Sequence, residues 1–313
     1  MTERYKIESC SRTFRGGYRH FILETPLWKL PGSALGIMCD QVWLKLEHLQ
    51  TGGSFKARGM LNRLLSNPIP DSGVIVASGG NAGIATAAAA KELGVRCEVF
   101  VPEVSSPAKR ARLAALGATV VVTGAAYADA LKACIDRQQQ TGALLTHAYD
   151  QPEVLTGAGT LALEIEQQGG LPDSVLVSVG GGGLIGGVVS WFERRARVVA
   201  LEPELAPTLF RARAAGEPVD VAVSGIAADS LGAKRIGHLA WEATQAHVRD
   251  ALLLDDDSIR AAQLWLWKEL KLAVEPAAAL PLAALQSGRY TPRADEKVCL
   301  IICGANLDPA TLA

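Results

Sequence analysis

Residues 74–101 read VIVASGGNAGIATAAAAKELGVRCEVFV. A β-branched run comes first, a glycine loop and an alanine-rich stretch follow it, and a second apolar run ends the segment. Short apolar strands that alternate with helical stretches are typical of βαβ units with a parallel sheet. Gly94 falls where the helix should end, since a left-handed residue is favoured there. This segment predicts an α/β fold.

The same alternation continues along the chain. Residues 107–117 and 127–140 are predicted helices, as are the stretches LALEIEQQ and LIGGVVSWFERR further on. Residues 255–287 are expected to be mainly helical, with aspartates at the start of a helix, and VCLIIC is expected to be the last buried strand. Gly117 is a second predicted helix end. The sheet is therefore resumed in the second half of the chain.

Composition excludes several classes of function. The chain has 313 residues, 49% hydrophobic and 20% charged, enough to form one large domain or two apposed ones. Its net charge of -1 and its short apolar runs predict neither a nucleic-acid nor a membrane partner. Because the N-terminal residues resemble no secretion signal, we expect a cytoplasmic protein. The cysteines and histidines lack zinc-ligand spacing, which argues against a catalytic zinc.

A lysine lies near the start of a predicted helix. In SFKARGMLNRLL the apolar residues form a helical stripe, with Ser54 as the expected N-cap and Lys56 in the first turn. A helix N-terminus and burial both favour the neutral amine that can form a Schiff base. For an isolated lysine, a solvated position on an amphipathic helix is the better interpretation, so the neighbouring motifs must decide.

Two glycine-rich loops lie at predicted strand-to-helix junctions. They span Ser78–Gly83 (SGGNAG) and Gly180–Gly187 (GGGGLIGG). Glycines let backbone N–H groups approach an oxyanion, and a helix start adds a favourable dipole. One or two glycines more often mark a tight turn, whereas four in succession after a strand favour an anion site. The loops would suit a cofactor phosphate and a substrate carboxylate.

A dinucleotide site is the rival interpretation of the second loop. Gly181, Gly183 and Gly186 fit GxGxxG after a strand, and Glu202 follows at the end of the next strand. This pattern alone predicts an NAD-dependent dehydrogenase. It leaves SFK, SGGN and the terminal CGAN without roles, so it ranks second.

Taken together, these segments resemble the fold-type II pyridoxal-phosphate (PLP) enzymes, most closely the serine/threonine dehydratases and their short L-serine dehydratases. The likeness runs through TPLW, LKLEHLQTGGSFKARG, ASGGNAGIA, SVGGGGLIGG, SLGAK, VEPAAALPLAAL and CGAN. It implies an α/β fold like that of the tryptophan synthase β chain, with two open parallel-sheet domains and the active site between them. Residues 1–72 and 151–313 would form the large PLP-binding domain, and residues 73–150 the small domain.

The resemblance also implies roles for individual residues. Lys56 would bind the cofactor, with Phe55 and Ala227 on opposite faces of the ring and Asn81 at the pyridoxal 3'-oxygen. Cys303 would face the pyridine nitrogen. Other residues would bind the phosphate (Gly180, Gly181, Gly182, Gly183 and Leu184) and the amino-acid substrate (Ser54, Ser78, Gly79, Gly80 and Asn81).

The implied reaction is β-elimination, in which a β-hydroxy amino acid yields a 2-keto acid and ammonia. A neutral thiol at Cys303 cannot keep the pyridine nitrogen protonated as a carboxylate would, and this suits elimination better than transamination. Related racemases carry a serine where this chain has Gly79, so racemisation is an alternative without an evident second acid/base. A β-replacement enzyme of the cysteine-synthase type is also less favoured, since GGGGL lacks that branch's threonines. A PLP-family relative recruited as a binding protein is the non-enzymatic alternative.

Three further expectations come from the same resemblance. Glu202 and Ala206 match a corner that binds a cation in these dehydratases, and the sequence does not choose between potassium and a divalent ion. The family usually forms dimers, so we expect a homodimer. Gly53, Gly79 and Ala148 are small, which suggests room for a β-substituent as large as an aryl group.

Overall fold

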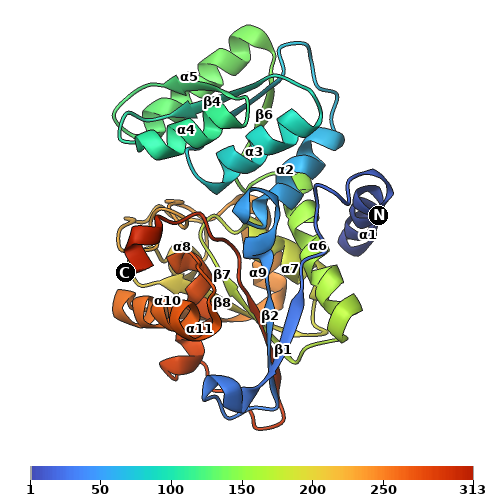
Figure 1. Cartoon of the computed structure of the whole chain (residues 1–313), viewed down its shortest axis with the longest axis vertical. Helices are drawn as coiled ribbons and strands as arrows, with labels where there is room; N and C mark the ends of the chain where they lie inside the picture. Colours follow the sequence, from blue (N-terminus) through green and yellow to red (C-terminus); the bar gives the residue numbers. More distant parts are fainter. Residues whose placement is uncertain (1, 313) are drawn as a thin grey trace.

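The computed structural model describes residues 2–312, whose strands form two separate sheets (Figure 1). The strands are β1 (Leu27–Pro31), β2 (Gln41–Lys45), β3 (Val74–Ala77), β4 (Cys97–Val101), β5 (Thr119–Val122), β6 (Leu144–Thr146), β7 (Ser174–Ser178), β8 (Arg197–Pro203), β9 (Val248–Leu254) and β10 (Lys297–Ile301).

The larger sheet has six strands in the order β1-β2-β10-β7-β8-β9. All neighbours are parallel except β1, which runs antiparallel to β2 at one edge. Strand β10 pairs with β2 on one side and β7 on the other, so the end of the chain lies in the middle of the sheet. Parallel strands buried on both faces are continuously apolar, as in β7 and β10 here. This pairing brings the segments after β7 and β10 to one edge of the sheet.

The smaller sheet has four parallel strands in the order β5-β4-β3-β6. All four lie between residues 74 and 146, as the sequence pattern predicts. Gly94 and Gly117 have φ angles of +65° and +87° just after the helices that they end, which confirms their predicted role. In Figure 1 this sheet and its helices form the upper part of the molecule.

Helices cover both sheets. The N-cap of α10 is Asp255, whose carboxylate accepts a hydrogen bond from the Ser258 amide at 2.8 Å, so the predicted aspartate cap is confirmed. The longer helices are α1 (Glu3–Gly17), α2 (Lys56–Leu65), α3 (Asn81–Glu92), α4 (Pro107–Ala115), α5 (Tyr127–Thr141), α6 (Pro152–Gly169), α7 (Gly183–Phe192), α8 (Thr208–Ala215), α9 (His238–His247), α10 (Asp256–Leu270) and α11 (Pro276–Gln286). Short 3-10 helices are η1 (Gly32–Leu35), η2 (Glu47–Leu49), η3 (Thr51–Gly53) and η4 (Pro309–Leu312).

Helix α2 joins the two parts of the molecule. Its Leu61 and Leu64 belong to the same buried apolar cluster as Val76 of β3 and Ile84 of α3. All strands of the smaller sheet lie between residues 72 and 150, and all strands of the larger sheet lie before residue 72 or after residue 150. We propose domain boundaries at these positions, with α2 contributing to the core of the small domain although it precedes residue 73.

A buried charge network fixes α2 on the large domain. The guanidinium of Arg58 donates to Glu47 and Glu164, at 2.8 and 2.7 Å for the closest oxygens. Lys45 also donates to Glu164, at 2.8 Å. The charges of two buried cations and two buried carboxylates therefore balance. Arg58, the centre of this network, lies two residues after Lys56.

None of the helices between residues 2 and 312 is long and apolar enough to cross a membrane.

Candidate active site

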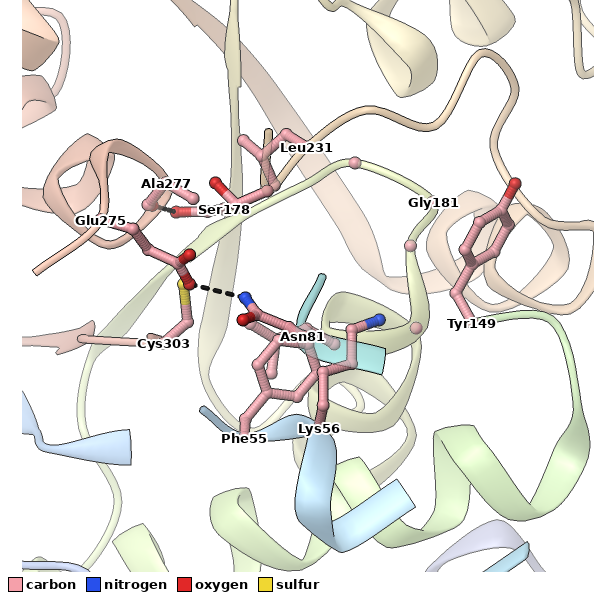
Figure 2. A pocket seen from close by; sticks show the side chains of 15 residues that line it. Phe55, Lys56, Asn81, Tyr149, Ser178, Gly181, Leu231, Glu275, Ala277 and Cys303 are labelled. Carbon is pink, nitrogen blue, oxygen red and sulfur yellow. Dashed lines mark hydrogen bonds between the residues drawn. The ribbon is translucent and has the colours of Figure 1, made fainter. Parts of the chain in front are cut away.

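The predicted site segments meet in one pocket between the two domains (Figure 2). Each segment comes from the start of a helix or the end of a strand, where parallel α/β folds place their ligands. The residues lining the pocket are Phe55, Lys56, Asn81, Tyr149, Ser178, Gly180, Gly181, Gly182, Gly183, Leu184, Ser230, Leu231, Glu275, Ala277 and Cys303.

Lys56 is the first residue of α2, and its amine lies in the pocket. The Nζ atom donates a hydrogen bond to the carbonyl oxygen of Ala148 at 2.6 Å. Burial lowers the pKa of Lys56 to about 8, although Cys303 and Glu275 act in the opposite direction. A substantial fraction of the amine is therefore neutral near physiological pH and can act as a nucleophile or base.

The predicted N-cap at Ser54 is wrong. Helix α2 has Phe55 at the N-cap position, and Ser54 is extended and forms an isolated bridge with Gly304. The Ser54 hydroxyl is buried without a hydrogen-bond partner and does not line the pocket. The pairing with Gly304, far along the chain, holds this residue in the extended conformation and delays the helix start.

The second glycine loop connects β7 to α7. Gly182 is the N-cap of α7 at φ +91°, and no side chain caps the helix. A Cβ atom on Gly181 would overlap the Tyr149 ring, and one on Gly182 would overlap Ala240. The loop thus needs glycine, and the first N–H groups of α7 are left for an anion.

The first glycine loop connects β3 to α3 in a similar way. Gly80 is the N-cap of α3, again without a capping side chain, and its amide donates to the Ser78 hydroxyl at 3.3 Å. Ser78, Gly79 and Gly80 are half-buried beside the pocket, and only their neighbour Asn81 lines it. The uncapped start of α3 suits the carboxylate that the sequence predicts for this loop.

Asn81 is held between two side chains of the large domain. Its Nδ2 atom donates to Oε1 of Glu275 at 2.8 Å, the dashed line in Figure 2. Its Oδ1 atom accepts from Nδ2 of Asn306 at 2.5 Å. Burial raises the pKa of Glu275 to about 7, against the lowering effect of the Asn81 hydrogen bond. Glu275 therefore changes protonation near neutrality.

Cys303 lies beside Glu275 and across the pocket from the glycine loop (Figure 2). Burial raises the pKa of its thiol far above the ordinary value, and the negative charge of Glu275 raises it further. The thiol is consequently neutral at any physiological pH, as expected for a group facing a pyridine nitrogen. The Cys303 carbonyl oxygen accepts from the Phe55 amide at 3.1 Å, which ties the end of β10 to the lysine segment.

Ala227 does not line the pocket. It is completely buried in the core of the large domain, whereas Ser230 and Leu231 of the same loop do line the pocket. The Ser230 and Leu231 amides donate to the Ala227 carbonyl, so the loop turns between these positions. The structure thus brings the later residues of this segment, rather than Ala227, to the pocket.

Glu202 lies at the end of β8, away from the pocket, and its carboxylate accepts hydrogen bonds from the amides of Leu209 and Phe210, both at 2.7 Å. Burial raises its pKa to about 7, despite those hydrogen bonds. Ala206, also buried, begins the turn into α8. Among residues 2–312 no three His, Cys, Asp or Glu side chains cluster as metal ligands, so a cation here would depend on backbone carbonyls.

The small residues expected to enlarge the substrate pocket do not all do so. A Cβ atom on Gly53 would lie 2.6 Å from Oδ1 of Asn306, and one on Gly79 would lie 3.1 Å from the Ser105 hydroxyl. Polar side chains from other segments therefore fill the space beside both glycines.

Sequence reasoning missed several lining residues. Glu275 lies in VEPAAALPLAAL and Ser230 in SLGAK, two segments that carry the resemblance but had received no role. Ser178, Leu231 and Ala277 also lie in such segments (SVGGGGLIGG, SLGAK and VEPAAALPLAAL) without a predicted role, whereas Tyr149 lies outside all of them.

Comparison with known proteins agrees with this geometry. The family described as "Pyridoxal-phosphate dependent enzyme" matches residues 18–304. An L-threonine ammonia-lyase of Geobacter sulfurreducens is 36% identical over 279 residues, 87% of this chain and 69% of the relative. A phenylserine dehydratase of Ralstonia pickettii is 33% identical over 312 residues, 96% of this chain and 93% of the relative. The structure of maize serine racemase superposes with a TM-score of 0.91 at 28% identity, covering 99% of this chain and 95% of that one.

The fold and the pocket define an α/β protein with a buried lysine of lowered pKa and two glycine loops at uncapped helix starts. The chain belongs to the pyridoxal-phosphate-dependent enzyme family, within its serine/threonine dehydratase branch, and its cofactor is PLP. The predicted fold-type II architecture is confirmed, and the dinucleotide interpretation of the second glycine loop is wrong.

The residues present fit this cofactor. The buried Lys56 amine can bind an aldehyde, the glycine cradle at the uncapped start of α7 can hold a phosphate, and Phe55 offers an aromatic face. The neutral thiol of Cys303 completes the set at the opposite side of the pocket.

Proposed function

We propose that this enzyme is a PLP-dependent ammonia-lyase that converts a β-hydroxy amino acid of the serine, threonine or phenylserine type into a 2-keto acid and ammonia. The observation that carries the proposal is the buried Lys56 amine, with its pKa lowered to about 8, in a pocket that also contains the uncapped glycine loop of α7. Relatives named as deaminases or dehydratases of such amino acids support it.

Each element of the site has a part in this reaction. PLP, when bound, supplies the electron-withdrawing ring that stabilises negative charge at the substrate α-carbon. Lys56, as a neutral amine at Nζ, takes the α-proton. The Ser78–Asn81 loop binds the substrate carboxylate at the start of α3, and the Gly180–Gly183 loop with Leu184 binds the phosphate.

Cys303 favours elimination over other PLP chemistry. Its thiol stays neutral, so it does not hold a proton on the pyridine nitrogen as a carboxylate would. The ring would then stabilise negative charge at the substrate α-carbon less strongly, which would favour loss of a β-hydroxyl group.

Racemisation is the second candidate, because the maize serine racemase has the same fold over almost the whole chain. A racemase needs an acid/base on the face opposite Lys56. Gly79 offers no side chain there, and this ranks racemisation below elimination. Replacement of the β-substituent by another nucleophile ranks lower still.

The deciding experiment is a substrate comparison. The PLP-loaded enzyme is incubated separately with L-serine, L-threonine and phenylserine, and release of 2-keto acid and ammonia is followed. Equal amounts of the two products from at least one substrate are expected. Formation of D-serine without ammonia would instead establish racemisation. A visible absorption change without turnover of any substrate would overturn the proposed elimination and point to a binding or replacement role.

We also propose a cation site at Glu202 and Ala206. The buried carboxylate faces no cationic side chain in the described part of the chain, and its pKa is raised to about 7 by burial, so a bound cation would stabilise its charged form. Added K⁺ or Mg²⁺ should raise the melting temperature above pH 7 in the native protein but not in Glu202→Gln. Equal responses in the two proteins would rule the site out.

We further propose that the enzyme is a cytoplasmic homodimer. All six cysteines are free, which suits a reducing compartment. Trp28 and Met38, in the segment from β1 to β2, are 38% and 87% exposed, and a second copy packed on this segment would bury them. Light scattering after gel filtration should give twice the mass of the chain; a monomer would contradict the dimer.

A further inference from the structure

The amide of Asn81 has one hydrogen atom left for a ligand. Its Oδ1 atom accepts from Asn306, and one Nδ2 hydrogen is donated to Glu275. An amide group carries two N–H donors, so the second one remains available in the pocket. This donor is the group that the resemblance assigns to the pyridoxal 3'-oxygen.

The direction of this amide is not determined by Asn81 itself. A side-chain amide can rotate by half a turn and exchange its oxygen and nitrogen at little cost in shape. The flipped amide would present an oxygen to the pocket and repel the 3'-oxygen instead of donating to it. Some neighbouring group must therefore select one orientation.

Glu275 accepts at one end of the Asn81 amide, and at the other end Asn306 and Arg112 form a chain of hydrogen bonds that favours the same orientation. The Nδ2 atom of Asn306 donates to Asn81 and, at 2.8 Å, to the carbonyl oxygen of Gly52. The Oδ1 atom of Asn306 accepts from the Arg112 guanidinium at 2.6 Å. Arginine can only donate, so Oδ1 of Asn306 must face it and Nδ2 must face Asn81.

The chain crosses between the domains. Arg112 lies on α4 of the small domain, Asn306 follows β10 of the large domain, and Asn81 begins α3. Gly53 leaves the space that the Asn306 amide occupies, because a Cβ atom there would lie 2.6 Å from Oδ1 of Asn306. The φ angle of Gly53 is +77°, which also favours glycine at this position.

We propose that Arg112 and Asn306 are positioning residues that orient the Asn81 amide so that it donates to the cofactor. Two groups that cannot reverse their roles hold the Asn306 amide: the Gly52 carbonyl, which can only accept, and the Arg112 guanidinium, which can only donate and lies on the small domain. Cofactor binding therefore depends on the placement of α4, although Arg112 does not line the pocket.

The first test is Asn306→Asp. A carboxylate has the same shape and still accepts from Arg112, but it cannot donate to Asn81. The apoprotein is titrated with PLP and binding is followed by the visible absorption band. We expect PLP affinity to fall about tenfold, the size expected when a donor is replaced by an opposing oxygen.

Two further variants separate orientation from structure. Arg112→Met removes the terminal donor at an exposed position and should weaken PLP binding by about threefold, since the contact is solvated. Arg110→Met is the matched control on the same helix, because Arg110 donates to the Ser105 carbonyl at 3.0 Å and takes no part in the chain. Its PLP affinity should be unchanged.

The decisive comparison uses Asn81→Ala as a second background. If Asn306 acts through the Asn81 amide, Asn306→Asp should cause no further loss of PLP affinity once Asn81 is alanine. An unchanged loss in that background would show a purely structural role and overturn the proposal. Native-like PLP affinity in Arg112→Met would also overturn it, even if Asn306→Asp proved too unstable to purify.

Discussion

The Nζ atom of Lys56 donates its hydrogen bond to a backbone carbonyl, that of Ala148, at 2.6 Å. Within residues 2–312 Lys56 forms no ion pair that would hold its charge. Ala148 follows β6 in the small domain, so the lysine of the large domain is aligned by the other domain. Burial, without an ion pair to oppose it, favours loss of the amine's proton.

The lowered pKa of Lys56 predicts how cofactor capture depends on pH. Only the neutral amine attacks an aldehyde, and with a pKa of about 8 this form increases as pH rises through that value. The rate of PLP capture by the apoprotein should rise up to about pH 8 to 9 and then level off. A free lysine derivative measured alongside should continue to accelerate towards pH 10, near its ordinary pKa. A protein profile that follows the free lysine would contradict the predicted shift.

Replacement of Lys56 by alanine should abolish turnover. The variant lacks both the amine that binds the cofactor and the base for the α-proton, so 2-keto acid release should fall by at least about 1,000-fold. Lys132→Ala is the control, because Lys132 is on an exposed helix face with 78% of its side chain accessible. Near-native activity in the Lys56 variant would exclude the assigned role.

Gly181→Ala should weaken PLP binding through a steric clash. A methyl group at this position would overlap the Tyr149 ring and displace the loop for which we propose phosphate binding. We expect a loss of affinity of about tenfold or more, measured by titration of the apoprotein.

A second substitution tests the cause of that loss. Tyr149→Ala combined with Gly181→Ala removes the clashing ring and should restore part of the affinity. Gly16→Ala is the matched control, since nothing lies within 4 Å of a Cβ atom there. No recovery in the double variant would mean that the clash is not the reason.

Arg58→Met should destabilise the fold strongly. The substitution leaves the buried carboxylates of Glu47 and Glu164 without their main partner, which typically costs about 3–5 kcal/mol. Arg137→Met is the comparison, because its ion pair with Glu98 is on the surface and should contribute less than about 1 kcal/mol. Urea unfolding of both apoproteins measures the difference. Similar losses would show that burial does not set the contribution of Arg58.

Local sequence patterns and motifs were sufficient to predict the helices and strands and the central residues of the candidate site. The alternation of strands and helices in 74–101, the glycine helix ends and the aspartate cap of α10 depend on neighbours in sequence, so each could be predicted without tertiary information. The motifs that surround them in the sequence identified four candidate site elements: Lys56, Asn81, Cys303 and the Gly180–Gly183 loop. The fold places all of them in one pocket.

Contacts between segments that are distant in the sequence decided the local conformations and side-chain partners that the sequence did not predict. Ser54 is not a cap because it pairs with Gly304, and Gly53 gives no room for substrate because Asn306 fills it. Asn81 meets Glu275 and Asn306 across 194 and 225 residues of chain.

The amino-acid sequence by itself determined the α/β class, the helix ends and the glycine loops at strand-to-helix junctions, since propensity, glycine conformation and spacing act over a few residues. The role of Lys56 came from the resemblance of several motifs to one family. Only the tertiary structure decided which side chain faces which. That choice depends on how β10 inserts between β2 and β7 and on how the small domain meets the large one, and both depend on packing rather than on local pattern.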